Sequence, residues 1–147
     1  MSESSVESQT WSTVRSYLLG KELGFSQSEP GDTLTLQLDD EDWQLEVTPG
    51  GLLVCQAGYA LEDMQSLLSD GTPEDLGSDE LAKQTKFYLN QIVSKHRNWL
   101  KHDGFVERTE MNDEYVAIFY ERTMDLKNLS ELEHAVRRCR KQFTPSP

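Results

Sequence analysis

The order of apolar and polar residues along the chain predicts alternating helices and strands. In some stretches apolar side chains recur every three or four positions, as on one face of a helix; in others they alternate with polar ones, as in a half-buried strand. In chain order, this periodicity predicts a helix over 8–23, strands over 33–38, 43–47 and 52–57, an extra short helix around 60–69, a helix over 78–100, strands over 105–111 and 114–123, and a helix over 128–143.

Short turns between consecutive strands indicate how the strands pair. Asp39–Asp42 separates the first two strands, Pro49-Gly50-Gly51 the next two, and Asn112-Asp113 the last two. Strands joined by such turns pair with each other in antiparallel fashion. We therefore expect an α+β fold, with helices packed on one side of an antiparallel sheet and the element order α-β-β-β-α-β-β-α.

The two ends of the chain differ in composition from the part between them. Residues 1–7 are rich in serine and glutamate and poor in apolar side chains, so we expect a loose N-terminal tail. Residues 144–147 contain two prolines and form an expected C-terminal tail. The remaining residues, 8–143, have the length of one ordinary domain, and we expect them to form a single α+β domain.

Four stretches of the sequence carry a resemblance to known proteins. They are Phe87-Tyr-Leu-Asn-Gln-Ile92 on a helix, Asp103-Gly-Phe105 opening a strand, the strand Tyr115–Arg122, and a capped helix from Asn128. Together with the order of elements over 8–143, they resemble type III secretion chaperone-like proteins and the related YbjN-like bacterial proteins. The resemblance implies a small acidic protein that often self-associates and, in the chaperone branch, binds an extended segment of a client. It implies no catalytic residues.

The charge of the chain makes several partners improbable. There are 26 acidic and 14 basic side chains, so the formal net charge is −12, which repels nucleic-acid phosphates and anionic lipid headgroups. The N-terminus has no basic and apolar leader, and the longest apolar run is Tyr115–Tyr120. We expect a cytoplasmic protein that binds neither nucleic acid nor membranes.

The residue types that carry out chemistry do not form a recognisable motif. The four acids of 39–42 lack the spacing of a calcium loop, which favours a solvated turn over a metal site. His96 and His102 are six positions apart and cannot bind a metal together from one helix face. Cys55 and Cys139 are interpreted as buried, reduced thiols, and the sequence leaves open whether they lie close together. We expect no enzyme activity, no cofactor and no metal.

Two charged regions are the candidate partner-binding surfaces. The first comprises Asp40, Glu41, Asp42 and Trp43, where Trp43 is either an exposed anchor for a partner or a lid on the core. The second comprises Arg137, Arg138, Arg140 and Lys141, whose charges also complement the dipole at the end of a helix.

The two halves of the chain differ strongly in charge. Residues 1–80 carry 17 acidic and 2 basic side chains, a net of −15, whereas 81–147 carry 9 acidic and 12 basic ones, a net of +3. The acidic half of one copy could therefore face the basic helix of a second, giving a homodimer.

Two functions fit these observations. The leading hypothesis is a small, acidic, non-enzymatic protein-binding module, chaperone-like, that recognises a polypeptide segment at an open sheet edge or in a groove between helix and sheet. The alternative is a regulatory or assembly protein that binds a folded partner through Trp43 and the acidic turn.

Overall fold

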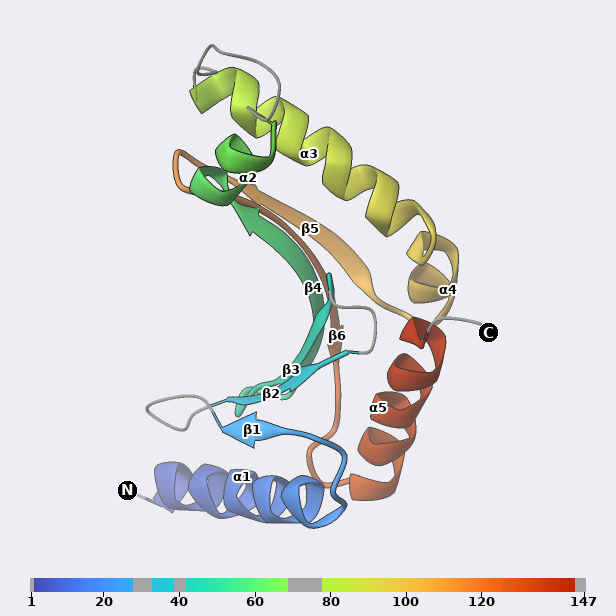
Figure 1. Cartoon of the computed structure of the whole chain (residues 1–147). Helices are drawn as coiled ribbons and strands as arrows, with labels where there is room; N and C mark the ends of the chain where they lie inside the picture. The colour runs from blue at the N-terminus through green and yellow to red at the C-terminus, as the bar shows by residue number, and fades with distance from the viewer. Residues whose placement is uncertain (1, 28–32, 39–41, 69–77, 145–147) are drawn as a thin grey trace. The chain divides into compact units, whose positions relative to one another are not determined.

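The computed structural model describes residues 2–27, 33–38, 42–68 and 78–144, and shows a mixed α+β fold (Figure 1). The helices are α1 (Ser2–Gly20), α2 (Leu61–Leu68), α3 (Ser78–Ser94), α4 (Arg97–His102) and α5 (Leu129–Phe143). The strands are β1 (Ser26–Gln27), β2 (Leu34–Gln37), β3 (Gln44–Val47), β4 (Leu52–Ala60), β5 (Val106–Met111) and β6 (Tyr115–Thr123).

The strands form one antiparallel sheet in the order β1-β2-β3-β4-β6-β5. β2 and β3 are paired through the register Leu36–Leu45, which brings their buried leucines to the same position across the ladder. The two-residue strand β1 adds to β2 by pairing Ser26 with Thr35. The predicted α+β fold with an antiparallel sheet is confirmed, and β1 is an addition to the predicted order.

Residue contacts divide the chain into two compact units. One consists of 1–55 and 121–147, and the other of 56–120, so that β4 and β6 contribute residues to both. The single domain expected over 8–143 stays a prediction.

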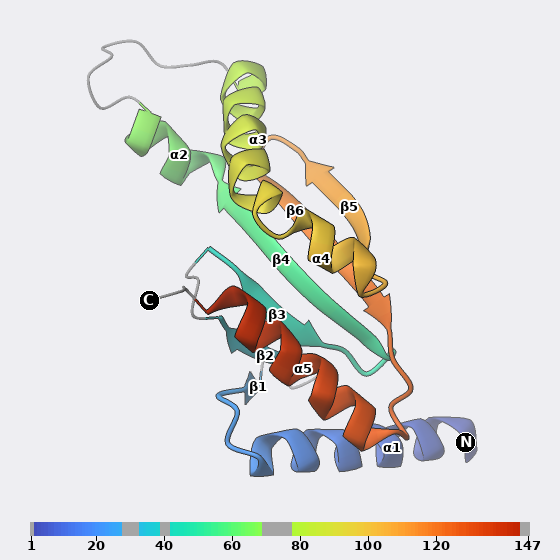
Figure 2. The same cartoon turned by 90° about the vertical axis from the view of Figure 1, so that its right-hand side faces the viewer.

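In the first unit, α1 and α5 contact each other, and α5 packs on strands of the sheet (Figure 2). Trp43, directly before β3, is fully buried with the centre of its ring 4.7 Å from that of Phe143 on α5. On the helix surface, the Tyr17 hydroxyl of α1 donates a hydrogen bond to Glu133 of α5, which also forms an ion pair with Lys21. These contacts join α5 to the core and to α1.

In the second unit, α3 and α4 cover strands β4, β5 and β6 (Figure 2). Leu89 and Val93 of α3 are fully buried, and the ring of Tyr88 packs at a tilt against that of Tyr59 of β4, with ring centroids 5.5 Å apart. The first amide of α2, that of Leu61, donates to the carbonyl of Glu114 in the β5–β6 turn at 2.8 Å. The turn is thereby tied to the end of β4.

Two element boundaries differ from the sequence-based expectation. α1 begins at Ser2, so residues 2–7 are helical where a loose tail was expected. The helix expected over 78–100 is broken at Lys95-His96: His96 N–H bonds the carbonyl of Val93, three residues back, and α4 then starts at Arg97. The helix predicted around 60–69 is confirmed as α2.

The segment between β3 and β4 turns so tightly that it requires a glycine. Gly51 has φ +88°, in the left-handed region, and its N–H donates to the carbonyl of Thr48. Its carbonyl in turn accepts the N–H of Met124 at 2.7 Å.

No helix within the described ranges is both long and apolar enough to cross a membrane.

Candidate functional site: a groove between α3 and the edge strand β5

Strand β5 is the last strand of the sheet, with β6 as its neighbour among the described strands. The hairpin closes with the N–H of Asn112 donating to the carbonyl of Tyr115 at 3.0 Å. Because an antiparallel ladder uses every second residue, we expect Glu107, Thr109 and Met111 to direct their N–H and C=O groups away from β6. β5 therefore offers a row of backbone donors and acceptors at the sheet edge.

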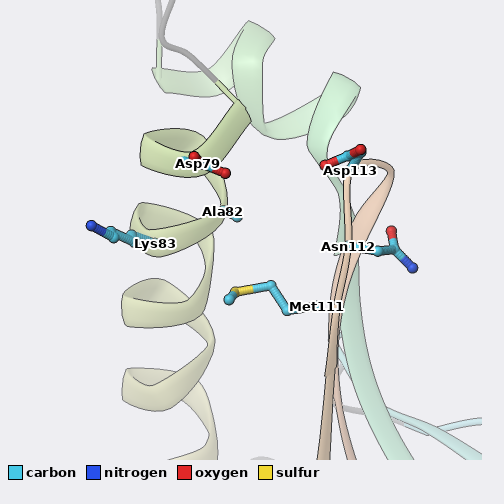
Figure 3. Close-up of a pocket in the computed structure, with 6 residues that line it drawn as sticks. All are labelled: Asp79, Ala82, Lys83, Met111, Asn112 and Asp113. Carbon is cyan, nitrogen blue, oxygen red and sulfur yellow. The ribbon is translucent and has the colours of Figure 1, made fainter.

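A pocket of about 270 Å³ opens between the first turns of α3 and the β5–β6 hairpin (Figure 3). It is lined by Asp79, Ala82, Lys83, Met111, Asn112 and Asp113. The thioether of Met111 extends from β5 toward α3, and the side chains of Asp79 and Asp113 face each other across the opening (Figure 3). The pocket thus combines an apolar floor with an acidic mouth.

Two large apolar side chains are exposed on these elements. Met111 is 51% exposed and lines the pocket, and Phe87 is 65% exposed, both unusual for large apolar residues. Phe87 is one turn after Lys83, whose side chain extends away from β5 (Figure 3). We therefore expect Phe87 on the outer surface of α3, and Met111 and Ala82 as the apolar lining of the pocket.

A hydrogen-bonded network closes the far end of the groove. Arg97 of α4 donates to Asn90 of α3 at 3.2 Å and to Glu107 of β5 at 3.2 Å. The hydroxyl of Tyr120, on β6, donates to the same carboxylate. These contacts join α3, α4, β5 and β6, and they hold the helix at a fixed distance from the strand.

The network shifts the pKa values of its members. Partial burial opposes ionisation of Glu107, but the hydrogen bonds from Tyr120 and Arg97 outweigh it and hold the pKa of Glu107 below its ordinary value. Burial, together with the negative charge of Glu107, raises the pKa of Tyr120 to about 12. Both residues are consequently in fixed protonation states near neutral pH, which suits a structural clamp rather than proton transfer.

The opposite face of β5 has a different character. The guanidinium of Arg108 lies 4.3 Å from the centre of the Phe119 ring, and it pairs with Glu110, which accepts the hydroxyl of Tyr115 at 2.7 Å. Val106, on the same face by strand alternation, is 69% exposed. Val106 is therefore an exposed apolar residue on the same strand that points away from the groove.

Trp43 is part of the core, and its interpretation as an exposed anchor is wrong. Its side chain has no exposed surface, because β3 begins directly under the end of α5 and the indole fills the space against Phe143. Asp42, which precedes it, is exposed. Asp40 and Glu41 lie outside the described residues.

The basic residues predicted to bind a partner lie along α5. Arg137 forms an ion pair with Glu133 at 2.7 Å, one turn earlier on the helix. Arg138 and Lys141 are exposed and Arg140 is half-buried, in the last turns before Phe143. Because Trp43 contacts Phe143, Asp42 lies in the same region as the basic end of α5. None of the described residues that the sequence predicts to bind a partner lines the pocket between α3 and β5.

Side chains that carry chemistry are scattered over the parts of the chain that the structure describes. Within those ranges no three His, Cys, Asp or Glu residues are grouped so as to hold a metal ion. His96 accepts the indole N–H of Trp99 at 3.0 Å in the turn that separates α3 from α4. The imidazole thus has a structural role in the helix break.

The sequence contains only a weak signal for the groove residues. Ala82 lies between Leu81 and Lys83 on a helix, and a small apolar residue there is as consistent with the core as with a pocket wall. Met111 ends a strand whose charged residues, Glu107, Arg108 and Glu110, are typical of a sheet edge. That charge pattern is the one feature that could have identified β5 as the exposed edge.

In comparisons with known proteins, no protein-family model, curated protein sequence or solved structure matches the chain.

Proposed function

We propose that the chain is a non-enzymatic protein-binding module that takes up an extended polypeptide segment along β5. The observation that carries this proposal is the coincidence of a sheet edge with a pocket whose apolar lining is formed by Met111 and Ala82. A segment added to a sheet edge gains main-chain hydrogen bonds, and pockets for alternate side chains select its sequence. The chaperone-like character inferred from the sequence is part of this proposal.

The groove favours a particular kind of segment. An added strand would turn every second side chain toward α3, where one apolar side chain would fill the pocket over Met111 and Ala82. Asp79 and Asp113 are both exposed at the pocket mouth, and two facing carboxylates attract a cation. We therefore expect a segment in which apolar residues alternate and a lysine or arginine lies beside one of them.

Selection from random peptides displayed on phage tests this proposal. The expected result is enrichment of extended sequences with alternating apolar residues and a nearby basic residue, and tight binding of a synthetic peptide of that sequence. Met111→Ala should weaken the peptide's binding by about tenfold, the effect of removing roughly 1.4 kcal/mol of apolar contact. Val106→Ala removes an equally exposed apolar side chain from the opposite face of β5 and should leave binding unchanged. If selection yields no sequence above background, or Val106→Ala weakens binding as much as Met111→Ala, the groove is not the binding site.

The alternative predicted function, contact with a folded partner through the acidic turn, lacks the anchor that motivated it. With Trp43 buried, the exposed groups of that region are charged ones such as Asp42 and Lys141. Exposed charged residues at the edge of an interface contribute mainly to the association rate and the specificity of binding. We retain it as a second surface for a charged partner, and its test is whether Lys141→Glu changes a partner's binding while Met111→Ala does not.

A further inference from the structure

Two cysteines distant in the sequence face each other inside the first unit. Cys55 is in the middle of β4 and Cys139 is in the second half of α5, 84 positions further along the chain. The thiol of Cys55 donates a hydrogen bond to the sulfur of Cys139, with the two Sγ atoms 3.9 Å apart. Both side chains are buried, with exposed fractions of 0% and 1%.

We infer that Cys55 and Cys139 form an intramolecular disulfide when the protein meets a peroxide. A disulfide has its sulfurs about 2.05 Å apart, so the two Sγ atoms must approach by roughly 2 Å, a movement within reach of side-chain rotation on a strand and a helix that are already packed together. The bond would tie β4 to α5 and close a long chain segment. It would be independent of the α3–β5 groove, because both residues belong to the other compact unit.

The reaction balances in two steps with hydrogen peroxide as the oxidant. The thiolate of one cysteine attacks a peroxide oxygen, the O–O bond breaks, and the leaving hydroxide is protonated to water, which leaves a sulfenic acid. The thiolate of the second cysteine then attacks the sulfenic sulfur, the S–O bond breaks, and a second water forms as the S–S bond is made. The two thiols lose two electrons and two protons in total, and the peroxide is reduced to two waters.

Burial makes the reaction depend on opening of the structure. Burial, with a further contribution from the Cys139 sulfur, raises the pKa of the Cys55 thiol well above its usual value, so little reactive thiolate exists in the closed form. Peroxide can reach the sulfurs only when the second half of α5 moves away from β4. We therefore expect slow oxidation of the native protein and faster oxidation at urea concentrations just below the unfolding transition.

Mass spectrometry of the full-length chain tests the inference. Reduced protein is treated with hydrogen peroxide, its remaining thiols are alkylated, and it is digested without reductant. The expected result is loss of both alkylation sites, an intact mass lower by two hydrogen atoms, and one cross-linked peptide containing Cys55 and Cys139. Cys55→Ala and Cys139→Ala should each yield no intramolecular cross-link. Two thiols that remain alkylatable, sulfinic acids without a cross-link, or disulfide-linked dimers of the wild-type chain would overturn the inference.

Thermal unfolding provides a second measurement on the wild-type protein, which does not depend on how the variants fold. A cross-link that fits the folded geometry restricts the unfolded chain, so oxidation should raise the thermal midpoint by at least about 5 °C, and a reductant should reverse the rise. A lower midpoint after oxidation would show that the folded structure does not accommodate the bond, and would equally overturn the inference.

Discussion

Glu107 shows how one carboxylate fixes several elements at once. It accepts hydrogen bonds from Arg97 of α4 and Tyr120 of β6 while belonging to β5, so its charge holds the closed end of the groove together. Charged groups in such networks contribute more than isolated surface pairs, because each partner orients the others. The geometry of the proposed binding site therefore depends on a residue that does not line the pocket.

Replacing Glu107 by Gln should destabilise the protein and change its response to acid. Because the pKa of Glu107 is lowered in the folded protein, its contribution to stability is present above the carboxyl group's ordinary pKa and is lost as pH falls through the folded value. We expect Glu107→Gln to lower the free energy of unfolding by about 1 kcal/mol at neutral pH and to show a smaller further loss on acidification than the wild type. Urea unfolding at several pH values measures both effects.

Glu62→Gln serves as the control, because it changes an exposed glutamate on α2. If Glu107→Gln and the wild type lose stability equally on acidification, the result contradicts the network.

Trp43 provides a second test at the scale of one residue. Its side chain is fully buried against Phe143, so Trp43→Ala removes a large apolar group and leaves a cavity. We expect the free energy of unfolding to fall by about 3–5 kcal/mol. Wild-type stability in this variant, measured by chemical denaturation, would mean that the indole is on the surface after all.

At the scale of secondary structure elements, the close approach of β4 and β6 depends on Gly58. A Cβ at this position would lie 2.9 Å from Cβ of Ala117 and 3.1 Å from the carbonyl oxygen of Val116. Neither neighbour can move without distorting β6, which would also shift β5 and the groove beside it. The glycine is therefore needed for packing and not for a turn.

Gly58→Val should cost about 1–3 kcal/mol of stability, the usual range for overpacking. Gly20→Ala is a matched control, because nothing lies within 4 Å of a Cβ built at Gly20. The control should be neutral or slightly stabilising, since it reduces the freedom of the unfolded chain. Thermal unfolding of the two variants checks the difference, and similar midpoints would contradict the described packing of β4 on β6.

Particular residues explain which elements could be predicted from the sequence. The leucines of β2 alternate strictly, and Asn128 caps α5 by accepting the N–H of Glu131, so both elements have local signals that agree with their burial. The break at Lys95-His96 has none, because the apolar spacing runs on through Trp99 and Leu100 without a glycine or proline. The beginning of α1 was missed because its first residues have the polar composition of a tail.

The candidate site was less predictable than the fold because it depends on what packing leaves exposed. Burial of Trp43 follows from where α5 ends, and partial exposure of Met111 from its place on the edge strand beside α3. Both are tertiary facts that the spacing of residues along one element does not contain. Binding at a sheet edge or in a groove between helix and sheet stays a prediction, which rests on the fact that an antiparallel sheet that does not close into a barrel has edges.

At the scale of the whole molecule, charge should govern how partners approach. The net charge of −12 attracts basic segments over distances longer than any contact, and we expect Asp79 and Asp113 to hold a cation at the pocket. We expect binding of a selected peptide to weaken by about tenfold when the ionic strength rises from 0.05 to 0.5 M, with most of the change in the association rate. Stopped-flow measurements test this, and Asp79→Asn with Asp113→Asn should flatten the salt dependence. A salt-independent rate would show that the acidic residues do not take part.

A second copy of the chain is a competing occupant of the same edge. Two β5 strands could pair across a two-fold axis and cover the groove. Light scattering over a range of concentrations separates the cases, because a dimer formed through β5 should dissociate when the selected peptide is added. A dimer that binds the peptide without dissociating must use another surface.

Fluorescence anisotropy of a selected peptide with Thr109→Pro and Thr109→Ala tests the central claim most directly. Thr109 is in the middle of the edge strand, and we expect its N–H to face away from β6, so proline removes one outward donor without breaking the β5–β6 ladder. Thr109→Ala makes a comparable change of side chain and keeps the N–H. The account predicts that Thr109→Pro abolishes binding with little change in thermal midpoint, while Thr109→Ala binds like the wild type. Equal peptide affinity of the two variants would contradict recognition along the β5 edge.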